Sequence, residues 1–296
     1  MIVVKIGGSL NGNFRNVCAD IKRLYDMGKK VVVVHGGGEA TNELSRRLGI
    51  EVEKVISPSG IESRRTTKEV LEVFVMACAG KINRFLVAEL QSLGVQAIGL
   101  SGADGRVVEA ERKVIKAVTP EGKIRLIRDD YSGKIRSINA TFLNQLLDMG
   151  FVPVVAPVAF SSEGELLNVD GDTLASKIAL CLKSEDLIIL SDVPGLLRDL
   201  RDPESLIEDV FPDMEAEILR VAKGRMKKKV MALFEAVRGG VERGIIASGY
   251  NDSPIISALQ GKGTIFRGRS ECNFEPDGVG REVWKWRISQ SALEAG

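Results

Sequence analysis

Residues 2–9 read Ile-Val-Val-Lys-Ile-Gly-Gly-Ser, and residues 31–38 read Val-Val-Val-Val-His-Gly-Gly-Gly. Each stretch begins with mostly apolar, β-branched residues, which is typical of a strand buried on both faces. Between them, Val17, Ile21 and Leu24 recur at helical spacing. Because strands and helices continue to alternate, the sequence predicts an α/β protein: a three-layer sandwich with a mainly parallel sheet between helices.

The other apolar patterns indicate where further elements lie. Thr66–Leu93 is expected to be helical, and Val107–Arg128 to form a hairpin that turns near Pro120–Gly122. Helices are also expected at about 39–48, 139–149, 170–182 and 226–237, and strands at 97–100, 152–155, 187–190, 245–247 and 264–266.

The composition limits the classes of function. The 296 residues (32.1 kDa) hold 41 Lys+Arg and 40 Asp+Glu, and this net charge of +1 excludes a generally basic nucleic-acid binder. No apolar run is long enough for a membrane helix, and the first residues do not resemble a secretion signal. Four scattered cysteines without a CxxC pair favour a reducing cytoplasm. We therefore expect a cytoplasmic protein without a nucleic-acid or membrane partner.

Two glycine loops follow the first two strands, although neither GxxxxGK[ST] nor GxGxxG occurs. Ligands of open α/β sheets bind beyond the carboxyl ends of strands, and adjacent glycines let main-chain amides approach an anion. Lys5 in a buried strand also calls for an anion. The loops together favour a phosphate site, whereas either one alone is equally consistent with a simple turn.

The string His-Gly-Gly-Gly at 35–38 also occurs in esterases, where it forms an oxyanion hole. That chemistry needs a G-x-S-x-G nucleophile and a histidine late in the chain. Residues 99–103 lack the last glycine of that motif, and His35 is the only histidine. The esterase interpretation is therefore excluded.

Three further polar strings have both a structural and a functional interpretation. Asn168–Asp172 opens a helix, where one aspartate is explained as a cap. Ser191–Gly195 follows a buried strand and is compatible with a turn, and Lys227–Lys229 is compatible with a solvated helix face. Lys229, however, borders the apolar stripe of its helix and could point into a cleft.

These strings resemble those of the amino acid kinase family, and they occur in the same order. Within the family the chain is similar to the N-acetylglutamate kinase branch. Residues 57–64 (Ser-Pro-Ser-Gly-Ile-Glu-Ser-Arg) resemble the subgroup that acts on aminoadipate or glutamate attached to a small carrier protein, LysW. The resemblance covers about residues 1–267 and rests on Lys5–Ser9, His35–Gly38, Gly99–Gly105, Asn168–Asp172, Ser191–Gly195 and Met226-x-x-Lys229.

The resemblance implies one kinase domain over residues 1–267, with the acceptor bound by its N-terminal half and the nucleotide by its C-terminal half. Residues 268–296 are then an extension of unknown role. ATP would transfer its γ-phosphoryl group to a side-chain carboxylate, giving an acyl phosphate, with Mg²⁺ held by the phosphates and no metal held by the protein. The partners implied are an acidic LysW carrier and a second copy of the chain in a homodimer.

The resemblance also assigns roles to residues. Lys5 and Lys229 neutralise charge on the moving phosphoryl group, and Asp172 orients both lysines. The amides of Gly8 and Gly37 touch that group, and Gly37 and Gly38 border the acceptor. The amino-acid end is held by Arg64 and Asn168, and the nucleotide lies along Ser191, Asp192, Gly195 and Leu196.

This chain departs from the pattern at three positions. Relatives often carry arginine in place of Glu62 and tyrosine in place of Arg65, whereas Asp170 resembles the carrier-dependent subgroup. Two other functions stay open: a kinase of free N-acetylglutamate, and a nucleotide-binding sensor or storage protein without turnover. Aminoadipate and glutamate differ by one methylene, which a pocket separates weakly. A basic rim for the carrier is expected from Arg64, Arg65, Lys81, Arg84, Arg112 and Lys113.

Overall fold

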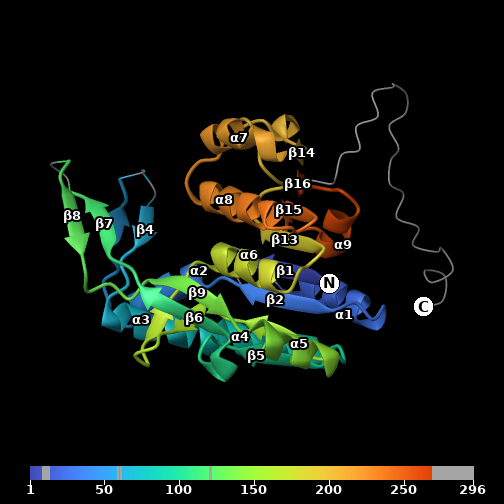
Figure 1. The fold of residues 1–296 in the computed structure, drawn as a ribbon, viewed down its shortest axis with the longest axis horizontal. Coiled ribbons are helices and arrows are strands. Elements are labelled where there is room, and N and C mark those ends of the chain that lie inside the picture. Colours follow the sequence, from blue (N-terminus) through green and yellow to red (C-terminus); the bar gives the residue numbers. More distant parts are fainter. Residues whose placement is uncertain (9–13, 59, 61, 120–121, 269–296) are drawn as a thin grey trace.

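A central eight-stranded sheet organises the molecule (Figure 1). The computed structural model describes residues 1–8, 14–58, 60, 62–119 and 122–268. The strand order is β14-β16-β15-β13-β1-β2-β10-β5, and the pairs are parallel except for β15 with β16. The strands are β1 (Ile2–Ile6), β2 (Val31–His35), β5 (Ala97–Leu100), β10 (Val152–Val155), β13 (Asp186–Ser191), β14 (Asp209–Val210), β15 (Arg243–Ser248) and β16 (Thr264–Arg267).

Helices cover both faces of this sheet, which confirms the predicted three-layer α/β architecture. One face packs against α1 (Arg15–Asp26), α4 (Asn83–Ser92) and α9 (Pro254–Leu259). The other packs against α5 (Ala140–Asp148), α6 (Gly171–Cys181) and α8 (Arg225–Arg238). The remaining helices are α2 (Gly38–Arg47), α3 (Lys68–Val75) and α7 (Glu215–Val221).

The alternation of side chains along β1 decides where Lys5 points. Ile2, Val4 and Ile6 belong to the core beneath α1 and α9, whereas Val3 belongs to the core beneath α6 and α8. Because successive strand residues face opposite sides, Lys5 lies on the side of Val3. The period of the strand therefore directs the lysine toward α6 and α8.

A second sheet and two small hairpins lie outside the central sheet. The second sheet has the order β12-β11-β6-β9, and the hairpins are β3–β4 and β7–β8 (Figure 1). Their strands are β3 (Lys54–Ile56), β4 (Glu62–Arg64), β6 (Val108–Arg112), β7 (Ile115–Val118), β8 (Ile124–Ile127), β9 (Gly133–Ile138), β11 (Val158–Phe160) and β12 (Leu166–Asn168).

One sequence prediction is wrong in its extent, and another is confirmed with an added detail. The hairpin expected over Val107–Arg128 is only β7–β8, because β6 pairs with β9 instead. The helix expected over Thr66–Leu93 is continuous but includes a π-helical segment, Met76–Ile82, between α3 and α4.

Within the described residues, no helix combines the length and the apolar character that crossing a membrane requires. Of the predicted extension 268–296, all but residue 268 falls outside the described residues.

Candidate active site

The two glycine loops touch each other, backbone against backbone. The neighbouring strands β1 and β2 are parallel, so the loops after them emerge at the same edge of the sheet. A methyl group added to Gly36 would lie 2.8 Å from the amide nitrogen of Gly8. One added to Gly8 would lie 3.2 Å from the nitrogen of Gly37 and 3.3 Å from that of Gly38. The close approach explains the glycines and brings these three amides together at the start of α2.

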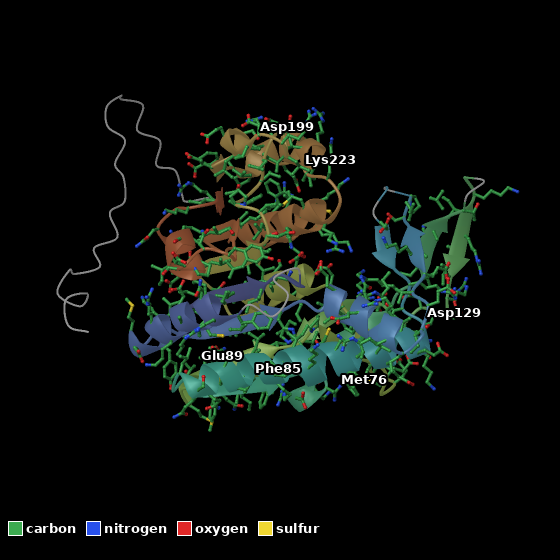
Figure 2. The ribbon with its side chains drawn as sticks, turned by 180° about the vertical axis from the view of Figure 1, so that it is seen from behind. Met76, Phe85, Glu89, Asp129, Asp199 and Lys223 are labelled. Atoms are coloured by element: carbon green, nitrogen blue, oxygen red, sulfur yellow. The ribbon has the colours of Figure 1, made fainter. Side chains whose placement is uncertain are left out.

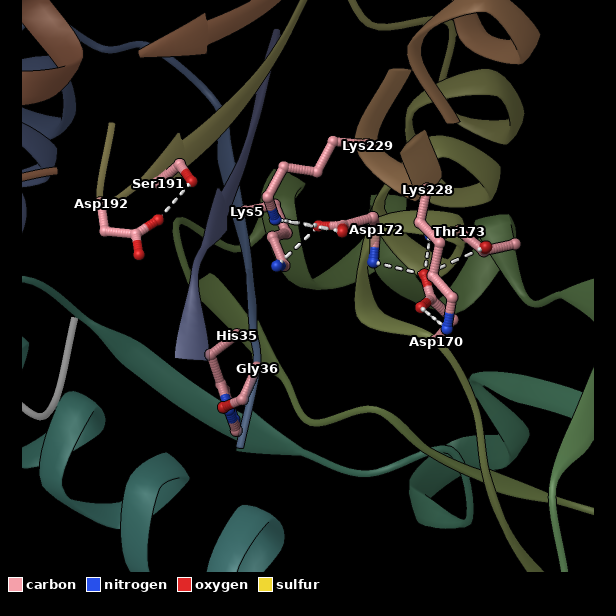
Figure 3. A network of polar contacts seen from close by, with 10 residues as sticks. All are labelled: Lys5, His35, Gly36, Asp170, Asp172, Thr173, Ser191, Asp192, Lys228 and Lys229. Atoms are coloured by element: carbon pink, nitrogen blue, oxygen red, sulfur yellow. Dashed lines mark hydrogen bonds and ion pairs between the residues drawn. The ribbon is translucent and has the colours of Figure 1, made fainter. Parts of the chain in front are cut away.

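Lys5, Asp172 and Lys229 meet on the face of the sheet that α6 and α8 cover (Figure 3). The Lys5 Nζ lies 2.6 Å from Asp172 Oδ1, and the Lys229 Nζ lies 3.2 Å from Asp172 Oδ2. All three side chains are largely buried, with exposures of 6%, 9% and 12% for Lys5, Asp172 and Lys229. Two ammonium groups from opposite ends of the sequence thus share one carboxylate.

The charges of this cluster are strongly coupled. Burial alone would raise the pKa of Asp172, but the ammonium groups of Lys5 and Lys229 hold it well below its usual range. Burial, and then the neighbouring charge of Lys5, lower the pKa of Lys229, and Asp172 only partly opposes this. The cluster carries two positive charges against one negative charge, so it attracts a further anion.

Asp170 fixes the start of α6 and with it the position of Asp172. Its Oδ1 accepts hydrogen bonds from the amides of Asp172 (3.1 Å) and Thr173 (2.9 Å), which makes Asp170 the N-cap of the helix. Its other oxygen lies 3.7 Å from the Lys228 Nζ. Asp170 therefore has a structural explanation as a cap, and it also holds Lys228 beside the cluster (Figure 3).

Both ring nitrogens of the single histidine, His35, form hydrogen bonds within the protein. The His35 ring lies with Nδ1 3.0 Å from the Gly36 carbonyl oxygen, and Nε2 is 3.1 Å from the Asn83 amide nitrogen. Asn83 also donates to the Val154 carbonyl at 2.8 Å. Burial lowers the pKa of His35 to about 4, so the ring is neutral at pH 7 with both nitrogens occupied. It holds β2 against α4 and is not available as a general base.

The predicted acceptor residues lie beside the second glycine loop. Arg64, on β4, donates from Nη2 to the Gly38 carbonyl and to Asn42 Oδ1, both at 2.6 Å. Its Nε is buried without a partner among the described residues. Asn168, on β12, donates to the Thr66 hydroxyl at 3.0 Å, two residues along the chain from Arg64. Arg64 and Asn168 therefore come from different sheets to neighbouring places.

The predicted nucleotide residues of the Ser191–Gly195 string and Leu196 lie at the end of β13 and in the loop that follows it. The Ser191 hydroxyl donates to Asp192 Oδ1 at 3.0 Å (Figure 3). A methyl group on Gly195 would lie 2.6 Å from the Thr264 hydroxyl. Leu196 is buried, its amide donates to that hydroxyl at 2.8 Å, and its carbonyl accepts from Ile207 at 2.9 Å. Leu196 therefore supports the loop through hydrogen bonds of both its backbone groups.

A cavity of about 320 Å³ opens beside this loop. It lies at the edge where β13 and β15 end and β16 begins, the same edge as the glycine loops. Apart from Pro194, its lining residues lie outside the motifs predicted from the sequence, although the string Gly261-Lys262-Gly263 marks a backbone turn with positive φ at both glycines. The cavity is lined by Pro194, Leu206, Glu208, Ala247, Ser248, Asn251, Gly261, Lys262 and Gly263.

Two of the six residues of the predicted basic rim, Arg65 and Arg112, form ion pairs within the protein. Arg65 bonds to Glu53 at 2.7 Å and to Asp129 at 2.8 Å. Arg112 stacks on Tyr131 and lies 3.5 Å from Glu165. The unusual Glu62 pairs with Lys54 across the β3–β4 hairpin at 2.8 Å. Arg64 and Arg84 donate to uncharged oxygen atoms, so the expected rim is only partly neutralised.

Comparison with known proteins decides the family. The model of the amino acid kinase family matches residues 1–248. The chain belongs to the amino acid kinase family. It is 43% identical over 265 residues to LysW-aminoadipate kinase from Deinococcus radiodurans, covering 90% of this chain and 91% of that one. A putative LysW-aminoadipate/LysW-glutamate kinase from Nitrosopumilus maritimus is 42% identical, with coverages of 88% and 96%. The predicted family is thereby confirmed.

Solved structures agree on the fold. Carbamate kinase from Giardia lamblia, bound to AMP-PNP, has a TM-score of 0.62 at 16% identity and covers 90% of this chain and 98% of that one. N-acetylglutamate synthase from Neisseria gonorrhoeae has a TM-score of 0.74 at 23% identity, over 91% of this chain and 59% of that one. At these identities the likeness confirms the amino acid kinase-like fold alone.

Proposed function

We propose that this amino acid kinase transfers the γ-phosphoryl group of ATP to the side-chain carboxylate of 2-aminoadipate or glutamate carried by LysW. The observation that carries the proposal is the buried Lys5–Asp172–Lys229 cluster beside the two abutting glycine loops. The names of relatives at 42–43% identity support both the kinase activity and the carrier-borne substrate.

The geometry suits the transfer of a phosphoryl group between two anions. The acceptor carboxylate is ionised at pH 7, so it needs no general base, and the only histidine is neutral and engaged. The barrier is electrostatic and falls when positive groups surround the moving phosphoryl group. Lys5 and Lys229 supply two ammonium groups, and the amides of Gly8 and Gly37 supply hydrogen-bond donors. Asp172 holds the two lysines at a fixed separation.

The two substrates approach from different halves of the sheet edge. Arg64, Asn168 and Gly38 are our candidates for the amino-acid end. Gly8, Ser191, Asp192 and Gly195 are our candidates for the nucleotide phosphates and sugar. The division of residues 1–267 into an acceptor half and a nucleotide half stays a prediction from the resemblance, and Gly8 and Asn168 are exceptions to it.

Mg²⁺ enters the proposal as part of the nucleotide substrate. Among the described residues, no group of three or more His, Cys, Asp or Glu side chains could hold a metal ion.

The homodimer and the cytoplasmic location stay predictions from the resemblance and the composition. Exposed Met76 and Phe85, on the outer side of the long α3–α4 helix (Figure 2), offer an apolar surface for a subunit contact.

A hydroxamate assay tests the proposed reaction, because hydroxylamine traps acyl phosphates. With ATP and Mg²⁺ we expect product from LysW carrying aminoadipate or glutamate, and far less from free N-acetylated amino acids. Equal turnover of free N-acetylglutamate would instead identify a small-molecule kinase. Binding of ATP without product on any acceptor would identify a non-catalytic nucleotide-binding protein.

The cavity beside the Ser191–Gly195 loop is our candidate site for the nucleotide base. Strands in a sheet are about 4.8 Å apart, so the end of β15 lies about 10 Å from that of β1, within the length of an extended ATP. Replacing Asn251, an exposed residue of the cavity wall, with tryptophan should fill this space. We expect the KM for ATP to rise about tenfold, equivalent to about 1.4 kcal/mol. The KM for the acceptor should not change, and an unchanged KM for ATP would place the base elsewhere.

A further inference from the structure

The β7–β8 hairpin projects from the body of the molecule and has two different faces (Figure 1). Ile115 pairs with Ile127 and Ala117 with Arg125, and paired residues of an antiparallel ladder point to the same side. Ala117 and Ile127 are buried and pack with Val55 of the β3–β4 hairpin. This side of β7–β8, which we call the inner face, is therefore already covered.

The opposite side, the outer face, is apolar yet open to solvent. It presents Lys116, Val118, Ile124 and Leu126, which form the alternate pairs of the same ladder. Ile124 is 60% exposed and Leu126 is 49% exposed. A hairpin with one covered face normally carries polar residues on the other, so exposed aliphatic side chains in a group mark an interaction surface.

The sequence of the hairpin, residues 115–128, holds four cationic side chains and one carboxylate, Glu121. Lys116, Lys123, Arg125 and Arg128 are all exposed, and none forms an ion pair within the described part of the chain. Of the carboxylates that follow β8, Asp129 pairs with Arg65 and Asp130 is buried, where it accepts from the amides of Thr66 and Ser132. An apolar face bordered by unpaired cations complements a partner that is apolar and acidic at its contact.

The base of the hairpin leads directly to the candidate active site. The amide of Lys113, two residues before β7, donates to the Ser132 carbonyl at 2.8 Å, and Ser132 bridges to Asn168. Burial lowers the pKa of Lys113, which also interacts with the charges of Asp170 and Lys228. From Lys113 to Val118 an extended chain spans about 17 Å. A partner on the hairpin could thus reach the site with an extended segment of several residues.

We propose that the outer face of the β7–β8 hairpin, with Lys116 and Arg128, is the docking surface for the acidic carrier protein that bears the substrate amino acid. The proposal rests on the proposed function, and it places the carrier contact on this hairpin rather than on the predicted basic rim. The apolar pair Ile124 and Leu126 supplies the buried contact, and the cations speed and orient the encounter.

Two double variants test the surface without touching the predicted catalytic residues. Ile124→Ser/Leu126→Ser removes the apolar contact, and Lys116→Glu/Arg128→Glu reverses the charge. All four side chains are exposed, so the fold should persist. Met149→Ser/Leu200→Ser, at two exposed positions on other elements, is the matched control. We expect each hairpin variant to raise the KM for LysW carrying aminoadipate about tenfold or more, with kcat and the KM for ATP unchanged.

Calorimetric titration with LysW that carries no amino acid separates this proposal from the proposed function. The wild type and the control should bind it, with affinity that falls as salt rises, and the hairpin variants should bind at least about tenfold more weakly. Equal carrier KM and equal binding in all proteins would overturn the docking surface while leaving the kinase reaction intact. A halved molecular mass of the Ile124→Ser/Leu126→Ser variant in light scattering would assign the face to a second copy and likewise overturn it. Binding without any turnover in the wild type would support the surface and refute the proposed function.

Discussion

Replacing Lys229 with alanine should lower kcat at least a hundredfold while ATP still binds. Its side chain is 12% exposed, and its ammonium group lies 3.2 Å from Asp172, opposite the ammonium of Lys5. In such a water-poor site one charge contact to a developing transition state is worth about 3 kcal/mol, which is about a hundredfold in rate. The measurements are kcat in the hydroxamate assay and the dissociation constant for ATP.

The neighbouring Lys228 provides the matched control. It lies on the same turn of α8, but it is 35% exposed and faces Asp170 at 3.7 Å. Lys228→Ala should therefore reduce kcat far less than Lys229→Ala does, because a partly solvated charge at that distance is screened. Similar effects of the two substitutions, or a near-wild-type rate for Lys229→Ala, would remove Lys229 from the reaction.

Local pattern was sufficient to predict the elements that surround the site. The β-branched runs predict the strands β1 and β2, and the glycines after them predict loops. The helical spacing of apolar residues likewise predicts α6 and α8. The direction of Lys5 could also be derived, because its apolar neighbours fix the two faces of β1. These features depend on residues only a few positions apart.

The pairing of distant segments could not be predicted in this way. The sequence over Val107–Arg128 alternates like one hairpin, but β6 pairs with β9, and nothing within the segment encodes that partner. The meeting of Lys5, Asp172 and Lys229 was an expectation from family resemblance, since the three residues come from three separate elements. Leu196 was likewise assigned to the nucleotide by resemblance alone, and the bonds of its backbone to Thr264 and Ile207 join segments that are distant in the sequence.

The sequence also could not predict which side chains of the β7–β8 hairpin are exposed to solvent. The outer and inner faces of the β7–β8 hairpin carry similar apolar residues, so alternation alone does not say which face is covered. Only the packing of Val55 against Ala117 and Ile127 identifies the inner face. The basic rim was predicted from the charges of its residues alone. The sequence does not show that Arg65 pairs with the carboxylates of Glu53 and Asp129.

The second large effect is expected from Asp172→Asn. Asparagine keeps the size of the side chain but removes the only negative charge between two buried ammonium groups. Loss of one member of a buried ionic network costs about 3–5 kcal/mol, and we expect the free energy of unfolding at pH 7 to fall by that amount. The rate should also fall about a hundredfold or more, because the lysines lose the group that positions them. Urea unfolding and kcat measure the two effects.

The pH dependence distinguishes a charge effect from a packing effect. The folded-state pKa of Asp172 lies below its unfolded value, near 3.9. The carboxylate therefore stabilises the fold above that pH, and its contribution is lost as pH falls further. The stability difference between wild type and Asp172→Asn should be constant near neutrality and should shrink below about pH 4. A difference that does not change with pH would assign Asp172 a role in packing alone.

The decline of the rate at alkaline pH tests the role of the Asp172 charge in a second way. Burial and Lys5 already lower the pKa of Lys229, so the wild-type rate should decline at a pH below the usual lysine value of about 10.4. Asp172 opposes that shift, and its removal should move the decline to still lower pH. If the residual activity of Asp172→Asn declines at the same pH as the wild type, the carboxylate does not control the charge of Lys229, and the proposed cluster does not operate as a unit.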